Sequence, residues 1–196
     1  RALGRDVSLL CAAGGLPGER HKLWQASSPS SYHMEYGYSC MGYEIPGAMG
    51  VKVADPSREV YAYVGDGTYL MMPSEIVTSV QEGIKLIVVV ANNHGFASIG
   101  SLSRSLGSGG FGTRFRLRGE QSGQLDGAPL PVDFAANARS LGAEAASVST
   151  IADFRLALQS ARKAQRTTVI VVETDREVSV LGYESWWDVA VAEVST

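Results

Sequence analysis

Nearly continuous apolar runs alternate along this chain with segments whose apolar residues recur at helical spacing. Such runs are typical of strands that are buried on both faces of a parallel sheet. Buried strands are therefore expected at residues 7–13, 60–64, 85–91 and 167–174, with a weaker candidate at residues 143–148. Helices are expected between them, at residues 45–54, 73–82, 133–141 and 150–161. This alternation predicts an α/β fold, a three-layer α/β/α sandwich with a mainly parallel sheet.

The most regular unit is a strand, a helix and a second strand over residues 60–91. A connection of this length between strands of one sheet is right-handed and leaves the strands parallel and close in space. Gly65-Asp66-Gly67 follows the first strand, and Asn92-Asn93 follows the second. Ligands of open α/β sheets bind at the carboxyl ends of the strands. The pattern therefore brings Asp66 and Asn93 together at that edge of the predicted sheet.

Asp66 and Asn93 both offer oxygen, the ligand atom that a hard cation such as Mg²⁺ prefers. Gly65 and Gly67 are expected to let the backbone approach closely, with φ values closed to other residues. The helix start that follows would supply N–H donors for an anion. The alternative is that the Asp-Gly turn and the Asn pair only cap two strands. Their joint spacing, with a helix and an apolar strand between them, favours a site for a metal and a diphosphate.

Gly-Asp-Gly and Asn-Asn, separated here by residues 68–91, resemble the diphosphate-binding signature of thiamine diphosphate enzymes. The resemblance implies that Mg²⁺ is held by Asp66, Asn93 and the backbone carbonyl of Gly95. It also implies that thiamine diphosphate is contacted by residues of these two turns and of an upstream loop: Ser39, Met41, Gly65, Asp66, Gly67, Thr68, Asn93, Gly95 and Phe96.

The upstream loop is expected over residues 32–44, which are rich in aromatic and polar side chains and unlike a core strand. By resemblance, Met41 wedges between the two rings of the cofactor and holds it bent. The same resemblance implies that the Ser39 carbonyl accepts a hydrogen bond from the pyrimidine amino group. The alternative for Met41 is a plain core methionine.

Over essentially its whole length, the chain resembles the diphosphate-binding half of the acetolactate synthase-like group. Within that group, residues 32–37, 125–127 and 182–187 are similar to the hydrolases of myo-inositol catabolism that cleave a C–C bond of a cyclic trihydroxylated 1,2-dione. The resemblance implies an enzyme that depends on thiamine diphosphate and Mg²⁺ and acts on a small-molecule substrate. Two alternatives stay open: an acetolactate synthase-like carboligase or 2-oxo acid decarboxylase, and a non-catalytic assembly module.

One diphosphate-binding domain is expected over residues 1–196, as the C-terminal part of a longer chain, because the sequence starts at Arg1 without an initiator Met. Family members activate the cofactor with a glutamate from a separate pyrimidine-binding domain, which is not expected within these residues. No catalytic residue is therefore assigned here. The resemblance implies that this second domain comes from the full-length chain or from another subunit, and that the protein is a homo-oligomer.

Composition narrows the possible partners. With 45% hydrophobic and 19% charged residues, this is an ordinary globular sequence. Its formal net charge of -3 provides no basic surface for nucleic acid or a membrane, and no apolar run reaches the length of a membrane span. The two cysteines, Cys11 and Cys40, form no disulfide framework, so a cytoplasmic location is the simpler expectation.

Residues 98–131 lose apolar periodicity and collect Gly, Ser and Arg, so a long loop is expected, mobile from about residue 101 in the absence of ligand. Residues 107–112 formally match the dinucleotide fingerprint, but no strand is expected before them and no amphipathic helix after, so that interpretation is rejected. The arginines of this loop are interpreted as solvated, with contact to a polyhydroxylated or anionic substrate as the alternative: Arg104, Arg114, Arg116 and Arg118.

Two further segments keep open interpretations. The turn over residues 14–18 is either a plain loop or a phosphate contact, and His21 is either a phosphate ligand or a structural residue. Residues 182–190 include Trp186 and Trp187, which are too apolar to stay bare. That segment is therefore expected to dock on this domain or on a neighbour.

Overall fold

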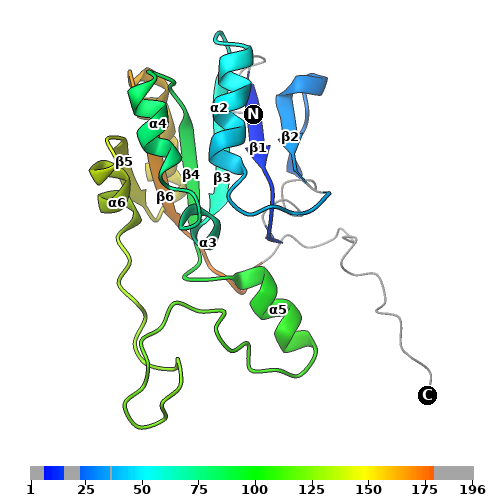
Figure 1. The fold of residues 1–196 in the computed structure, drawn as a ribbon, viewed down its shortest axis with the longest axis vertical. Helices are drawn as coiled ribbons and strands as arrows, with labels where there is room; N and C mark the ends of the chain where they lie inside the picture. The colour runs from blue at the N-terminus through cyan, green and yellow to red at the C-terminus, as the bar shows by residue number, and fades with distance from the viewer. Residues whose placement is uncertain (1–6, 16–22, 36, 179–196) are drawn as a thin grey trace, which may run out of the picture.

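The computed structural model describes residues 7–15, 23–35 and 37–178 of the chain (Figure 1). Its strands are β1 (Val7–Cys11), β2 (Tyr32–Met34), β3 (Glu59–Gly65), β4 (Ile87–Asn92), β5 (Glu144–Val148) and β6 (Thr168–Glu173). Its helices are α2 (Glu44–Ala54), α3 (Asp66–Tyr69), α4 (Glu75–Gln81), α5 (Ala97–Ser105), α6 (Phe134–Ser140) and α7 (Ile151–Lys163), together with the 3-10 helix η1 (Pro29–Ser31).

The strands form one six-stranded sheet in the order β2-β1-β3-β4-β6-β5, and every pairing is parallel. The carboxyl ends of all these strands therefore lie along one edge of the sheet. Figure 1 shows α3, α5 and the long segment between α5 and α6 beyond that edge. The predicted α/β class with a parallel sheet is confirmed.

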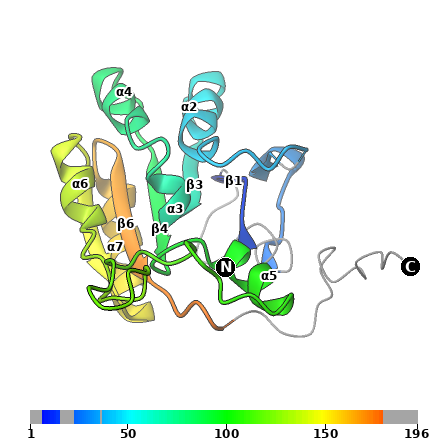
Figure 2. The same cartoon turned by 60° about the horizontal axis from the view of Figure 1, so that its bottom comes forward.

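Side chains alternate between the two faces of the sheet, as the geometry of a strand requires. On β4, Val88 and Val90 join the cluster that α2, α4 and α6 cover. Ile87 and Val89 belong instead to the cluster that packs against α7. Figure 2 shows α2 and α4 on one side of the sheet and α7 on the other. Helices on both faces complete the predicted three layers.

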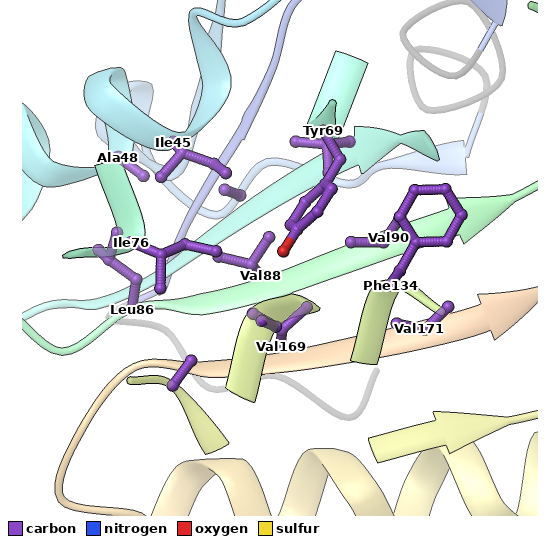
Figure 3. Close-up of a cluster of buried hydrophobic side chains, with 14 of the residues drawn as sticks. Ile45, Ala48, Tyr69, Ile76, Leu86, Val88, Val90, Phe134, Val169 and Val171 are labelled. Carbon is purple, nitrogen blue, oxygen red and sulfur yellow. The ribbon is translucent and has the colours of Figure 1, made fainter. Parts of the chain in front are cut away.

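Tyr69, the last residue of α3, ties the carboxyl edge of the sheet to the core (Figure 3). Its side chain is fully buried and meets the Phe134 ring edge-on, with 5.7 Å between the ring centroids. Its hydroxyl donates to Asn137 Oδ1 at 2.8 Å, which satisfies the buried polar atom. Burial raises the pKa of Tyr69 to about 12. Because α3 begins at Asp66, this anchor fixes the turn that carries the carboxylate.

Helix ends follow the expected signals closely. The Asp133 side chain accepts a backbone N–H at the start of α6, and Gly142 follows the end of that helix with a φ of 95°. The Thr150 side chain accepts a backbone N–H at the start of α7. One start is shifted, because α4 begins at Glu75 and not at Pro73.

Two expectations about loops are wrong. Tyr32–Met34, expected within a binding loop, forms the edge strand β2 alongside β1. A strand of three residues is too short to show an apolar alternation. Ala97–Ser105, of which all but Ala97 was expected to lie within the long loop, forms α5. Its apolar residues Ile99 and Leu102 are 57% and 48% exposed, so this helix is not a core element.

The rest of the long segment, residues 106–131, is organised by backbone hydrogen bonds without forming a helix or a named strand. Leu117 N–H donates to Ala128 O, and Leu130 N–H donates to Phe115 O, each at 2.9 Å. Mobility of this segment without ligand stays a prediction. Over the residues that the structure describes, no helix is long and apolar enough to cross a membrane.

Candidate functional site

The ends of β3 and β4 bring the two predicted polar turns side by side. Gly65 pairs with Ala91 in the parallel register, and α3, which includes the buried Thr68, starts in the next residue after Gly65. Gly95 N–H donates to Asp66 Oδ2 at 2.9 Å. The turn after β4 is therefore joined directly to the turn after β3.

Asp66 is a fully buried carboxylate that backbone N–H groups hold in place. Its Oδ1 accepts from Gly67 N–H at 2.9 Å, and its Oδ2 accepts from Gly95 N–H. Burial raises the pKa of Asp66, while these N–H groups and the nearby His94 act in the opposite direction. Two carboxylate oxygens offer about four lone-pair positions, so both can still bind a cation. A cation would also offset the cost of burying the charge.

The two asparagines of the pair have different surroundings. Asn92 donates from Nδ2 to Glu173 Oε1 at 2.8 Å and accepts at Oδ1 from His94 N–H at 3.3 Å. Asn93 Oδ1 is buried and has no hydrogen-bond partner among the described residues. An unsatisfied buried acceptor costs about 1–3 kcal/mol. A cation bound by this oxygen would remove that cost, so the oxygen donors of this site fit Mg²⁺.

The site is poor in charged ligands. Within the described part of the chain, no group of three or more His, Cys, Asp or Glu is placed to hold a metal ion. The ligand set expected here is one carboxylate, one amide oxygen and one backbone carbonyl. It does not count as such a group, because only one of its members is a His, Cys, Asp or Glu side chain. Mg²⁺ differs from metals held by protein cages because substrate phosphates and water complete its coordination. The arrangement fits a metal that binds together with a phosphate ligand.

The second glycine of the motif is required for space. A Cβ atom on Gly67 would lie 2.5 Å from Cε1 of Phe96. The Phe96 ring is itself packed edge-on against Phe115, with 5.7 Å between the centroids. Neither Gly65 nor Gly67 is among the residues with positive φ, so the expectation that both adopt backbone conformations closed to other residues is wrong. Gly67 is needed for the close approach of a ring, not for its φ.

The unusual backbone occurs in the other turn. Gly95 has a φ of 144°, and a Cβ atom there would collide with the Thr113 carbonyl oxygen. Phe96 N–H donates to Thr113 O, and Phe115 N–H donates to His94 O, each at 2.9 Å. Part of the long segment therefore pairs with the turn that carries the expected metal ligands. No motif in the sequence indicated this pairing.

The turn with Ser39 and Met41 reaches the same edge of the sheet. A Cβ atom on Gly42, the residue after Met41, would lie 2.7 Å from Cγ of Met72. Met72 follows α3, so this turn adjoins the Asp66 segment. Ser39 is exposed and Met41 is half-buried, which departs from a plain core methionine. The cofactor contacts expected of both residues stay predictions.

The arginines of the long segment differ in their contacts. Arg104 Nη2 and Arg114 Nη2 lie 3.3 and 3.2 Å from the Glu177 carboxylate oxygens. Arg118 is exposed, and Arg116 is half-buried beside an open pocket of about 460 Å³. The first two arginines are still partly exposed, so these ion pairs add to the solvated state that was expected for them. Glu177 was not singled out from the sequence.

Arg176 is a further cation that the sequence did not indicate. Its side chain is 12% exposed, and its Nε lies 3.4 Å from Glu177 Oε1. Burial and the neighbouring Arg114 lower the pKa of Arg176, although Glu177 acts in the opposite direction. A Cβ atom on Gly100 would lie 3.1 Å from Arg176 Nη2, so the guanidinium packs closely against α5.

Several predicted features lie outside the described residues. Only Gly14 and Gly15 of the glycine-rich turn are described, and a Cβ atom on Gly15 would lie 3.9 Å from Ser98 Cβ of α5. His21, the remainder of that turn and residues 182–190 are outside the described part of the chain.

Residues 12–172 match the family described as "Thiamine pyrophosphate enzyme, C-terminal TPP binding domain", and this chain belongs to that family. Its parallel sheet and the paired turns at the carboxyl edge agree with this membership. Thiamine pyrophosphate is another name for thiamine diphosphate, so the resemblance read from the sequence is confirmed.

Among its relatives, the chain is 48% identical over 193 residues to "3D-(3,5/4)-trihydroxycyclohexane-1,2-dione hydrolase 1" of Bacillus cereus, and 47% identical over 193 residues to the hydrolase of the same type from Bacillus anthracis. Each alignment covers 98% of this chain but 30% of the relative, so the chain spans about a third of their length. A thiamine diphosphate-dependent 4-hydroxybenzoylformate decarboxylase of Rhodococcus jostii RHA1 has a similar structure, with a TM-score of 0.72 and 23% identity over 89% of this chain and 30% of that one. At that identity the likeness concerns the fold alone.

Proposed function

We propose that Asp66, Asn93 and the Gly95 carbonyl hold Mg²⁺, and through it the diphosphate of thiamine diphosphate. The observation that carries this assignment is the buried Asn93 Oδ1, which has no donor among the described residues. Asp66 supplies the negative charge and is already fixed by two backbone N–H groups. With one carboxylate in the site, the divalent ion keeps positive charge for the diphosphate.

The remaining expected cofactor contacts belong to the same proposal. The Phe96 ring, which leaves no room for a side chain at position 67, would close one side of the diphosphate site. Thr68 is buried in α3, two residues after Asp66, and is proposed as a further contact. The further contacts proposed are Ser39, Met41, Gly65 and Gly67.

For the whole protein, we propose hydrolysis of the C–C bond between the two carbonyl carbons of a cyclic trihydroxylated 1,2-dione in myo-inositol degradation. The 48% identity over 98% of the chain to the Bacillus cereus hydrolase supports this substrate class. Addition of water across that bond yields one aldehyde and one carboxylic acid. Thiamine diphosphate, when bound, supplies a nucleophilic carbon and an electron sink for such chemistry. The described residues would hold its diphosphate end.

The rest of the protein is also part of the proposal. The relatives are about three times as long as this chain, since each alignment covers 30% of the relative. We infer that the chain is one C-terminal domain, and that a pyrimidine-binding domain of the full-length chain or of a second subunit completes the site. A homo-oligomer and a cytoplasmic location are part of this proposal.

Product analysis tests the substrate class. The full-length protein with thiamine diphosphate and Mg²⁺ is incubated separately with the trihydroxylated dione and with pyruvate. We expect an acid with an aldehyde group from the dione and no acetolactate from pyruvate. Efficient formation of acetolactate without ring opening would instead establish the carboligase alternative. Formation of carbon dioxide and acetaldehyde from pyruvate would establish the decarboxylase alternative.

Calorimetry tests the metal site. Titration of thiamine diphosphate into the full-length protein should show binding that depends on Mg²⁺ and is abolished by Asp66→Ala, because no second carboxylate is available to replace Asp66. Absence of any binding by the unmodified protein would favour the non-catalytic module. Unchanged binding by Asp66→Ala would remove Asp66 from the metal site.

A further inference from the structure

The turn that precedes α2 is built around one carboxylate. Glu35 Oε1 accepts a hydrogen bond from Tyr38 N–H at 3.1 Å, and Glu35 Oε2 accepts one from Cys40 N–H at 2.6 Å. Ser39, between these two donors, has a φ of 52°, a region that residues other than glycine seldom adopt. Such a conformation persists only where its surroundings hold it. The Glu35 carboxylate holds the backbone on both sides of Ser39.

These hydrogen bonds also fix the direction of the Ser39 carbonyl. The Ser39 C=O and the Cys40 N–H belong to the same peptide group, and no described peptide bond is cis. In a planar trans peptide the two bonds point in opposite directions. Because the N–H points to Glu35, the carbonyl points away from Glu35. Rotating this peptide plane would break the 2.6 Å hydrogen bond.

Glu35 affects the strength of that carbonyl as well as its direction. Hydrogen bonds from the Cys40 and Tyr38 N–H groups lower the pKa of Glu35, so it is a carboxylate at neutral pH. Charged acceptors form stronger hydrogen bonds than neutral ones. Hydrogen bonds that share a peptide group polarise each other. A negative charge at the N–H of this peptide therefore makes its oxygen a better acceptor.

The other end of the turn is held independently. Gly42 N–H donates to Glu44 Oε2 at 3.1 Å, and Glu44 is buried at the start of α2. Gly42 has a φ of 95°, and its backbone packs against the Met72 side chain. Because this end of the turn has its own contacts, a change at Glu35 should act on residues 37–40 and leave α2 in place.

We propose that Glu35 is a positioning residue that aims and polarises the Ser39 carbonyl toward the aminopyrimidine ring of thiamine diphosphate. The proposal rests on the proposed cofactor site, in which Ser39 is a contact, and it adds a role for a side chain that does not itself touch the cofactor. The group recognised is an exocyclic amine, which donates a hydrogen bond to a carbonyl oxygen.

The first test needs no cofactor. Hydrogen–deuterium exchange is measured on the ligand-free full-length protein, as Glu35→Gln, Glu35→Ala and the unmodified form. We expect the Tyr38 and Cys40 amides to exchange about tenfold faster or more in Glu35→Ala, and by a smaller factor in Glu35→Gln, which keeps one acceptor oxygen. Glu82→Gln is the matched control, because Glu82 is exposed beyond the end of α4 and should leave these amides unchanged.

The second test uses the cofactor without substrate. The rate at which bound thiamine diphosphate exchanges its C2 proton with solvent is followed by NMR, beside its affinity by calorimetry. Loss of a hydrogen bond to a charged group should slow C2 exchange about tenfold or more in Glu35→Ala, with a smaller change in cofactor affinity. If Glu35 only supported the fold, its substitution would weaken cofactor affinity without slowing C2 exchange more than it weakens binding.

The outcomes are separable from those of the proposed function. Normal cofactor binding with unchanged C2 exchange in both Glu35 variants would overturn the positioning role alone. Failure of the unmodified protein to bind thiamine diphosphate would overturn the cofactor site and this inference together. Failure to convert the dione would affect neither measurement. If Glu35→Ala loosens the whole protein, Glu35→Gln decides the question, because it preserves the size of the side chain.

Discussion

At the scale of single residues, Asn92 and Asn93 show how position decides the use of a side chain. Asn92 ends β4 and forms hydrogen bonds to Glu173 and to the His94 N–H. Asn93 comes one residue later, and its buried Oδ1 lacks a partner among the described residues. The first asparagine stabilises the turn, whereas the second is left with an acceptor for a ligand.

This difference predicts opposite results for the two alanine variants of the full-length protein. Asn93→Ala should abolish or greatly weaken Mg²⁺-dependent binding of thiamine diphosphate, with little loss of thermal stability, because it removes an unsatisfied acceptor. Asn92→Ala should lower the stability by about 1 kcal/mol, because Glu173 loses a hydrogen bond. Calorimetric titration and thermal unfolding measure the two effects. Equal affinities in both variants would contradict the ligand role of Asn93.

The buried Glu44 makes the stability of the protein depend on pH. Burial raises the pKa of Glu44, although backbone N–H groups including that of Gly42 act in the opposite direction. A carboxyl whose pKa is higher in the folded state than in the unfolded state binds its proton more tightly when folded. The contribution of Glu44 to stability is therefore present below its ordinary pKa of 4.5 and is lost as the pH rises through the folded pKa.

We therefore expect the free energy of unfolding of the unmodified protein to fall, relative to that of Glu44→Gln, as the pH rises above 4.5. Glutamine keeps the shape of the side chain and does not titrate. Urea unfolding of both full-length proteins over a pH series measures the difference. Glu75→Gln, a change of the same type on α4, serves as the control. If the free energy of unfolding of the unmodified protein instead rises with pH relative to that of Glu44→Gln, the raised pKa of Glu44 is contradicted.

Some residues of the site could be found from the sequence and others could not. Asp66 and Asn93 follow two apolar strands at a spacing that brings both to one edge of the sheet. The hydrophobic pattern alone was therefore enough to predict their position in the fold. Glu35 accepts hydrogen bonds from a backbone turn and Arg176 lies beside Glu177, and neither contact produces a periodic signal in the sequence. Gly67 does not have the unusual φ that was expected, because its constraint comes from the Phe96 ring, which only the folded chain brings near.

At the scale of elements, the strands of the core were predictable and the elements at the carboxyl edge were less so. The valines of β4 and β6 form continuous apolar runs because helices cover both faces of the sheet. Ile99 and Leu102 of α5, together with Leu106 directly after the helix, do recur at helical spacing, but the Gly and Ser residues among them obscured the pattern.

The pairing between the Gly95 turn and residues 113–115 gives a prediction at this scale. Gly95→Ala should destabilise the protein by about 1–3 kcal/mol, because a side chain at a φ of 144° is strained and this one would also meet the Thr113 carbonyl. The variant should also weaken Mg²⁺-dependent cofactor binding, because the pairing holds the expected metal ligands. Thermal unfolding and calorimetry of the full-length variant measure both effects.

A second glycine provides the control for that experiment. Gly50 lies in α2, has no heavy atom within 4 Å of a Cβ position, and is exposed. Gly50→Ala should therefore raise stability by about 1 kcal/mol through helix propensity and leave cofactor binding unchanged. Destabilisation by Gly50→Ala similar to that by Gly95→Ala would show that the Gly95 effect does not come from its backbone geometry.

At the scale of the whole molecule, the parallel sheet places the proposed diphosphate site at the carboxyl edge of its strands. Sequence periodicity predicted this architecture because the central strands β1, β3, β4 and β6 are buried apolar runs. It could not predict how the long segment pairs with the Gly95 turn, since those contacts are backbone hydrogen bonds such as Phe96 N–H to Thr113 O. Backbone contacts of this kind leave no mark on the order of side chains.

The same architecture predicts the behaviour of the chain in isolation. The proposed site holds the diphosphate end of the cofactor, and the pyrimidine end is expected to be gripped and activated by a domain that these residues do not include. We therefore expect the purified chain of 196 residues to be folded but to show no turnover of the trihydroxylated dione. Circular dichroism establishes folding, and product analysis establishes turnover. Adding the separately expressed remainder of the protein should restore activity.

Turnover by the isolated chain would instead require an internal base, with Glu35 and Glu44 as the first candidates. It would overturn the division of the site between two domains.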